Sequence, residues 1–314
     1  MPLTLEQYAS YLDTRDLVWP KAPDVEPPKA KPHLTRLPVK AVFWNVYGTL
    51  LVISEGELKF EVSSDFVMGV ALNKTIQEFK MWNSMSRKPG QPSDYLREIY
   101  GRILTEQRLA PGSERYPEVL SERLWEAVIK KLFQKDYQFD TGFFGSLNEF
   151  SKKVAYFFHA SLQGTAPYEG MAAALQGVAA AGLKQGLLAD SQCFTGVQLK
   201  RALDGQNGGV DLDQVVPIAY RFLSNECRCR KPSEQLFRTA LQALAAEGVG
   251  AGEVLHVGSS LTRDLGPARK LGMRTALFAG DRTSLAASPE QLKEPQYRPD
   301  VLLTELSQVV QVIG

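Results

Sequence analysis

The chain has 314 residues, of which 44% are hydrophobic, and a formal net charge of +1. This length and composition predict a globular protein with a large core, built as one big domain with an insertion or as two domains. Because basic and acidic residues nearly balance, the chain has no overall electrostatic footprint for nucleic acid or for an anionic membrane. Three cysteines are too few for a disulfide framework. We therefore expect a cytoplasmic protein with neither a signal peptide nor a membrane span.

The N-terminal region is rich in proline. Residues 20–38, PKAPDVEPPKAKPHLTRLP, contain six prolines and few apolar residues, which predicts an extended arm rather than a packed element. The arm is interpreted as residues 1–38, and it either lies on the surface or binds a partner. The folded core is expected to begin near Val39.

Short apolar runs and helical patterns alternate along most of the chain. Helices are predicted at 171–181, 233–247 and 262–271. Alternation of this kind is typical of a parallel sheet covered on both faces, so we predict a Rossmann-like three-layer α/β core. The predicted strands are VKAVFWNV, LKQGLLA, VVPIA, EVLHVG, TALFA and DVLL, at residues 39–46, 183–189, 215–219, 253–258, 275–279 and 300–303.

More than a hundred residues separate the first two predicted strands, far more than a normal crossover needs. This interval has helical periodicity of its own, so we predict an inserted helical cap at 56–165 and a core at 39–55 and 166–314. Four amphipathic helices are expected in the cap, with apolar faces used for packing. The face of the first comprises Phe66, Val70, Phe79 and Trp82.

Polar residues follow several predicted strands directly. The carboxyl ends of parallel strands meet at one edge of a sheet, where ligands bind near the switch point of the strand order. The sequence therefore predicts one pocket there. The candidate site residues are Asn45, Tyr47, Ser191, Lys231, Ser259 and Asp264.

Four segments in this order, NVYGTL, LLADSQ, RKPSEQLF and HVGSSLTRDLGPARKLGM, resemble the motifs of the haloacid dehalogenase (HAD) superfamily. The resemblance covers about residues 39–305 and includes a cap inserted between the first and second motifs. Tyr47 and the Ser259-Ser260 pair look closer to the 2-haloacid dehalogenase branch than to the phosphatases. One departure is that Leu261 follows Ser260, where that branch usually has asparagine.

The resemblance implies that the first motif supplies an aspartate that attacks the substrate, but this chain has Asn45 at that position. An amide oxygen is a poor nucleophile, so the covalent aspartyl-ester reaction is expected to be weak or absent. Two other interpretations stay open. The chain is an active hydrolase of a phosphomonoester or 2-haloacid that uses activated water, Asp190 or Cys193, or it is a regulatory protein that binds a metabolite without converting it.

Lys231 and Ser191 are expected to contact a small anionic metabolite, and oligomerisation is left open. No cofactor is expected, and magnesium would bind weakly, since Asn45 and Ser259 offer only neutral oxygens. The resemblance also implies a cap arginine that grips the substrate, for which the candidates are Arg87, Arg97 and Arg102. Asp190 is predicted to point away from Ser191 and to form a structural salt bridge. His256 is predicted to be a core residue and Cys193 an unreactive thiol.

Overall fold

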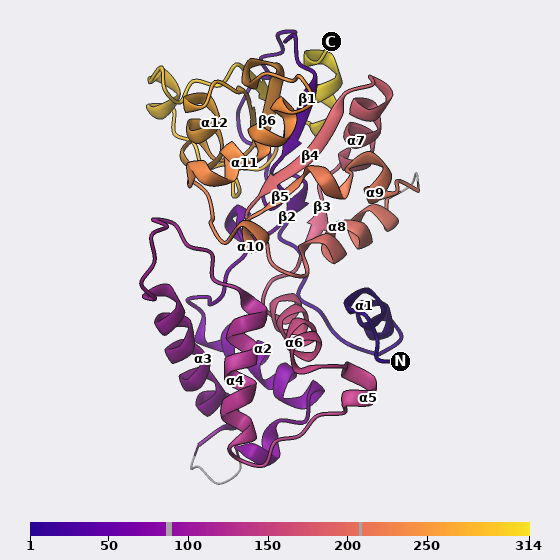
Figure 1. Ribbon diagram of the computed structural model, residues 1–314, viewed down its shortest axis with the longest axis vertical. Coiled ribbons are helices and arrows are strands. Elements are labelled where there is room, and N and C mark those ends of the chain that lie inside the picture. The colour runs from indigo at the N-terminus through magenta and orange to yellow at the C-terminus, as the bar shows by residue number, and fades with distance from the viewer. Residues whose placement is uncertain (86–89, 207–208) are drawn as a thin grey trace.

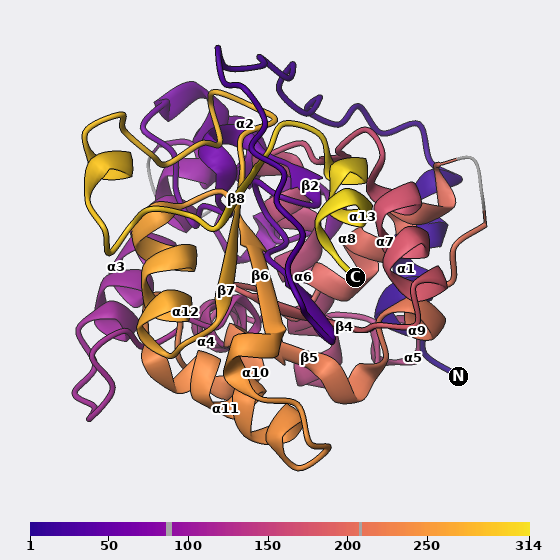
Figure 2. The ribbon, with the colours of Figure 1, turned by 90° about the horizontal axis from the view of Figure 1, so that it is seen from above.

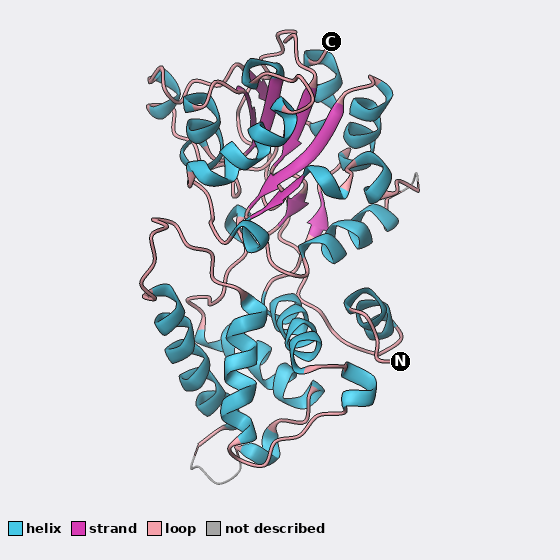
Figure 3. Cartoon of the chain, viewed as in Figure 1, coloured by secondary structure: helices cyan, strands magenta, loops and turns pink. Residues whose placement is uncertain are grey.

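The computed structural model describes residues 1–85, 90–206 and 209–314, which form an α/β core and a helical cap (Figures 1 and 3). Within these ranges, six parallel strands form one sheet in the order β5-β4-β1-β6-β7-β8. The predicted Rossmann-like α/β fold is confirmed. The strands are β1 (Ala41–Trp44), β4 (Lys184–Ala189), β5 (Arg221–Leu223), β6 (Val254–Gly258), β7 (Arg274–Phe278) and β8 (Val301–Leu303).

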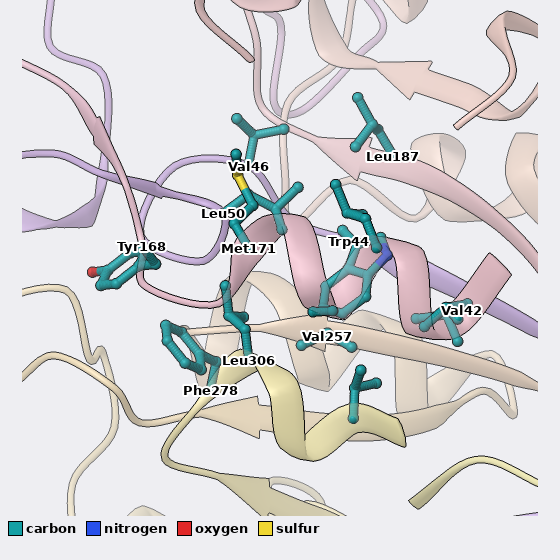
Figure 4. Close-up of a cluster of buried hydrophobic side chains, with 14 of the residues drawn as sticks. Val42, Trp44, Val46, Leu50, Tyr168, Met171, Leu187, Val257, Phe278 and Leu306 are labelled. Atoms are coloured by element: carbon teal, nitrogen blue, oxygen red, sulfur yellow. The ribbon is translucent and has the colours of Figure 1, made fainter. Parts of the chain in front are cut away.

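The central strand β1 is buried on both faces, which explains its unbroken apolar sequence. Successive side chains of a strand point to opposite faces. Accordingly, Val42 and Trp44 join one hydrophobic cluster (Figure 4), while Ala41 and Phe43 join another on the opposite face. The sheet is therefore the middle of three layers.

Helices cover both faces of the sheet (Figure 2). The cluster that contains Trp44 is completed by α7 (Met171–Ala180), α8 (Thr195–Asp204), α9 (Leu212–Val215) and α13 (Val309–Val312). The cluster that contains Phe43 is completed by α11 (Glu234–Ala245) and α12 (Gly266–Lys270). A short helix, α10 (Ser224–Cys227), follows β5. Within the described ranges, no helix is long and apolar enough to cross a bilayer.

The cap is a separate helical lobe (Figure 1). The chain enters it after β2 (Leu51–Val52) and returns at β3 (Ala166–Pro167), which pairs with β2 in antiparallel fashion. Its own hydrophobic cluster is centred on residues such as Trp125 and Phe158. The cap helices are α2 (Asp65–Glu78), α3 (Pro92–Arg108), α4 (Ser121–Phe133), α5 (Thr141–Phe144) and α6 (Leu147–Leu162).

The predicted apolar face of the first cap helix is wrong in part. Phe66 is 79% exposed, and Trp82 lies beyond the end of α2 and is 50% exposed. Phe79 is buried in the cap cluster as predicted, whereas the buried face of α2 itself is displaced by about two residues from the predicted one. The buried residues of α2 are Met68, Ala71, Leu72, Thr75 and Ile76.

The predicted third strand is also wrong. Residues 215–219 end a short helix and enter a 3-10 turn at Ile218–Tyr220, and the strand follows as Arg221–Leu223. Pro217 has no amide hydrogen and cannot donate to a sheet ladder, and it directly precedes the 3-10 turn. The true strand is only three residues long and contains an arginine, which hides it from a search for apolar runs.

The N-terminal arm is more ordered than the sequence predicts, and folded structure begins well before Val39. Its first part forms α1 (Leu5–Asp13), in which Tyr8 and Leu12 are buried in the hydrophobic cluster of the cap. Its later part is extended, and His33 pairs with Leu302 of β8 through two backbone hydrogen bonds of 2.9 Å. A proline-rich composition restricts the backbone but does not prevent such docking by its few apolar residues.

Candidate functional site

A cavity of 240 Å³ lies at the carboxyl ends of the central strands and is bordered on one side by the cap. Asn45 follows β1, Ser191 follows β4 and Ser259 follows β6, so the three meet where the strand order reverses. All six predicted site residues line this cavity, and its walls also include Glu57, Glu118, Asp190, Arg230 and Arg263. The structure thus brings the predicted residues together, while their chemical roles stay a prediction.

Lys231 is the centre of the polar network. Its Nζ donates a hydrogen bond to Oδ1 of Asn45, 2.7 Å away, and forms an ion pair with Asp264. All three residues are buried. Because the ammonium is already paired with a carboxylate, Lys231 is neutralised within the protein.

Asn45 is held from both ends of its amide. While Oδ1 accepts from Lys231, Nδ2 donates to the backbone oxygen of Tyr47 at 2.8 Å and lies 3.4 Å from Oγ1 of Thr49. Only an amide supplies a donor on one side and an acceptor on the other, since a carboxylate accepts on both. Both ends of the Asn45 amide therefore have hydrogen-bond partners within the protein.

The tight turn after Asn45 depends on Gly48. Its φ of 77° is in the left-handed region, and a Cβ there would lie 2.9 Å from both the backbone oxygen of Gly56 and Oγ of Ser259. Glycine alone fits this backbone without strain or collision. Gly48 thus lets the first motif approach the entrance to the cap and the fourth motif closely.

The Tyr47 hydroxyl is tied to α8. It donates to Oε1 of Gln198 at 2.6 Å and lies 2.9 Å from Oγ1 of Thr195. Burial raises the pKa of Tyr47 above its usual range, and the nearby Cys193 and Glu118 add to this effect. The phenol therefore stays protonated and helps to position the first motif.

Ser191 and Asp190 lie on the same side of the sheet edge, contrary to the prediction that Asp190 would point away. Both line the cavity because they come after the last strand residue, where the alternation of the pleat no longer applies. Oγ of Ser191 donates to Oδ1 of Asn225 at 2.6 Å. The predicted salt bridge of Asp190 is present, and its partner is Arg263.

Asp264 accepts a backbone amide hydrogen bond as well as the ion pair with Lys231. Its Oδ2 accepts from the backbone nitrogen of Ser260 at 2.9 Å, at the start of a π-helical turn, Leu261–Leu265. Although burial favours the neutral acid, the attraction of Lys231 prevails and lowers the pKa of Asp264. Asp264 is therefore a carboxylate that holds Lys231 and the fourth motif together.

The predicted cap arginine is wrong for the two candidates that can be placed. Arg97 forms an ion pair with Asp65 on the cap, and neither it nor Arg102 lines the cavity, whereas Arg87 lies outside the described residues. The arginines that do line it are Arg230 and Arg263, both from the core. Each directly precedes a motif residue, Lys231 or Asp264, and this adjacency was the one signal available in the sequence.

The remaining candidates are placed as the sequence predicts. His256 is fully buried within β6, with its ring 5.4 Å from that of Phe237, and it does not line the cavity. Cys193 is also absent from the cavity wall, and burial raises the pKa of its thiol above the usual range. A thiol that stays protonated is a poor nucleophile.

The side chains present do not fit a magnesium ion. Both oxygens of Asp264 are engaged, one by Lys231 and one by the Ser260 amide, while Asp190 is engaged by Arg263 and by the backbone of Lys231. Magnesium requires several free oxygen ligands. Here the ammonium of Lys231 and the guanidinium of Arg263 already contact the oxygens of Asp264 and Asp190. In the part of the chain that the structure describes, no group of three acidic, histidine or cysteine side chains has metal-binding geometry.

Comparisons with known proteins agree with this architecture. Residues 228–309 match the family model described as HAD-hydrolase-like. The 2-haloacid dehalogenase from Pseudomonas syringae pv. tomato DC3000 superposes with a TM-score of 0.50 at 17% identity, covering 86% of this chain and 96% of that one. The chain has the HAD fold. The predicted resemblance to the HAD superfamily is therefore confirmed.

Other solved structures are similar at lower scores. A HAD phosphatase from Thermococcus onnurineus has 18% identity and a TM-score of 0.46, with 86% of this chain and 96% of that one covered. YfnB from Bacillus subtilis, bound to magnesium, has 13% identity and a TM-score of 0.43 over the same shares. No curated protein matches the sequence. Because the likeness to the dehalogenase at 17% identity shows the fold alone, the closer resemblance to the 2-haloacid dehalogenase branch stays a prediction.

Proposed function

We propose that this HAD-fold protein binds a small metabolite between its core and cap and has little or no hydrolase activity by the aspartyl-ester route. The observation that carries the proposal is that both ends of the Asn45 side-chain amide are already hydrogen-bonded within the protein. Its oxygen accepts from Lys231 and its nitrogen donates to the Tyr47 carbonyl, so neither end is free to attack a substrate. An uncharged amide also lacks the nucleophilicity that formation of an ester requires.

The alternative, a hydrolase with a different protein nucleophile, has less support. Asp190 is engaged by Arg263 and by the backbone nitrogen of Lys231, which lies 2.8 Å from its Oδ1. Cys193 does not line the cavity and stays protonated. Asp190 thus reaches the cavity but has both carboxylate oxygens engaged, and Cys193 lacks access to the cavity.

The cavity has two groups suited to an anionic part of the ligand. The guanidinium of Arg230 is 3.9 Å from its nearest carboxylate oxygen, on Glu57, and its side chain is 40% exposed. The second group is the hydroxyl of Ser259, a residue that is only 4% exposed and lines the cavity. A phosphate or carboxylate placed between them would receive two hydrogen bonds.

The test compares the wild type with Asn45→Asp and Asn45→Ala, using p-nitrophenyl phosphate and 2-chloropropionate as substrates. We expect turnover by the wild type to equal that of Asn45→Ala, because neither has a carboxylate at this position. Restoring the carboxylate should raise the rate by at least about tenfold, since a covalent nucleophile contributes orders of magnitude. High wild-type turnover that Asn45→Asp fails to increase would refute the proposal.

A further inference from the structure

The carboxylates that line the cavity are not all paired with a lysine or an arginine among the described residues. Lys231 is paired with Asp264, and Arg263 is paired with both Asp190 and Glu57. Another lining carboxylate, that of Glu55, is paired with Lys59 at the rim. These pairs leave one carboxylate of the wall, that of Glu118, without a lysine or arginine within ion-pair distance among the described residues.

Glu118 belongs to the cap. It reaches the cavity because its backbone segment pairs with residues 228–230 of the core. It lies in the loop between α3 and α4, where Pro117 forms an antiparallel bridge with Cys229 of the core. The amide of Glu118 donates to the oxygen of Arg228 at 3.2 Å, and the amide of Arg230 donates to the oxygen of Tyr116 at 2.8 Å. This pairing holds the carboxylate beside the segment that leads into Lys231.

Neutral groups hold the Glu118 side chain in place. Its Oε2 accepts from Oγ of Ser224 at 2.5 Å, and its Oε1 lies 3.4 Å from Nε2 of Gln192. Burial raises its pKa to about 7, and repulsion by Asp190 adds to this, while Ser224 and Arg230 act in the opposite direction. A carboxylate in this position is oriented by neutral groups and, among the described residues, has no lysine or arginine in ion-pair contact.

The cavity wall also includes apolar side chains. Leu58 and Phe60, which follow the entrance to the cap, are among the residues that line the cavity, and Phe60 is only 8% exposed. Methylene groups next to a cationic nitrogen would be buried favourably there. Ser259 also lines the cavity, and its hydroxyl can donate a hydrogen bond to a ligand there.

We propose that the ligand carries a protonated amine that donates a hydrogen bond to the Glu118 carboxylate, in addition to an anionic group held near Arg230 and Ser259. This inference rests on the proposed binding function and names the class of ligand as a small zwitterion. The amine supplies the positive charge that the cavity lacks, and it does so in a buried setting where a charged hydrogen bond is strong. A purely anionic ligand would instead be repelled by Glu118.

The experiment measures affinities by calorimetry for two pairs of probes of matched shape. Phosphoethanolamine is compared with propyl phosphate, and β-alanine with butyrate, so that each pair differs by an ammonium in place of a methyl group. For the wild type we expect the ammonium member of at least one pair to bind about tenfold or more tightly, the usual value of a buried charged hydrogen bond. Equal affinities within both pairs would overturn the amine assignment.

Two variants test whether the preference for the ammonium member depends on Glu118. In Glu118→Gln the preference for the ammonium member should fall to within about twofold, because a neutral amide gives no charge attraction. In the control Glu55→Gln, which removes a carboxylate already paired with Lys59, the preference should persist. A preference that survives in Glu118→Gln overturns the inference. Failure of all four probes to bind the wild type overturns the binding function itself.

The pH dependence of the wild type gives a second test that needs no variant. Below about pH 7 Glu118 takes up a proton, so the ammonium preference should shrink between pH 8 and pH 5. The charged or titratable groups that face Glu118 are Asp190, Arg230 and Tyr47, and Tyr47 stays protonated over this range. A preference that is constant over this range contradicts the proposed contact.

Discussion

Lys231 and Asp264 form a buried ion pair, with both side chains only 2% exposed. Breaking such a pair leaves an uncompensated charge in a poorly solvated site. We therefore expect Lys231→Met and Asp264→Asn each to lower the free energy of unfolding by about 3–5 kcal/mol, as measured by urea denaturation. Combining Lys231→Met with Asp264→Leu should recover most of that loss, because no buried charge remains.

The control is the exposed pair of Lys40 and Glu253, whose side chains are 60% and 35% exposed. Lys40→Met should change the free energy of unfolding by less than about 1 kcal/mol. If Lys231→Met costs no more than Lys40→Met, the buried pair does not have the structural role that we assign to it. Because the pKa of Asp264 is lowered, its contribution is present above its ordinary pKa of 3.8 and is lost as the pH falls below that value.

Two fully buried histidines should make the protein sensitive to mild acid. Burial lowers the pKa of His159 and His256 to about 3 from an ordinary value of 6.5. As the pH falls through 6.5, the unfolded chain takes up protons that the folded chain cannot accept. Each histidine should then cost about 1.4 kcal/mol per pH unit between 6.5 and 3.

The measurement is the free energy of unfolding at several pH values for the wild type, His159→Leu and His256→Leu. Each variant should lose the acid sensitivity of one histidine. Glu118 acts in the opposite direction, because its raised pKa stabilises the folded state as the pH falls below 7. The difference between wild type and variant isolates each histidine. An identical pH dependence in all three proteins would contradict the prediction.

The N-terminal helix should contribute to global stability. Leu12 of α1 is 2% exposed and belongs to the hydrophobic cluster of the cap. Leu12→Ala should cost about 2–4 kcal/mol, because it leaves a void that the neighbours only partly fill. Val18→Ala is the matched control, since Val18 is 78% exposed and should change stability by less than about 0.5 kcal/mol. Similar losses for the two variants would show that α1 is not part of the cap core.

The arm also crosses the return from cap to core at Gly164. A Cβ at this position would lie 2.3 Å from the backbone oxygen of Pro20, so Gly164→Ala should displace the arm. We expect faster amide hydrogen exchange in residues 14–38 of this variant. In the control Gly69→Ala a new Cβ would meet no atom within 4 Å, so exchange in the arm should be unchanged. An arm that stays equally protected in both variants would contradict this contact.

The sequence alone determined where most strands lie along the chain and which residues follow them. Parallel strands place their carboxyl ends at one edge of the sheet, so this pattern was enough to predict that Asn45, Ser191 and Lys231 share a pocket. The same reasoning failed for β5, whose three residues contain too little apolar pattern to be recognised. It also displaced the buried face of α2 by about two residues.

Only the tertiary structure decided which charges meet. Glu118 reaches the cavity from a loop that has no regular periodicity, and Glu57 meets Arg263 from more than two hundred residues away. The packing of α1 against the cap through Tyr8 could not be predicted from the sequence either, because one short helix gives a weak hydrophobic pattern. The physical reason is that periodicity reflects the local geometry of the backbone, whereas ion pairs and docked helices depend on distances between residues far apart along the chain.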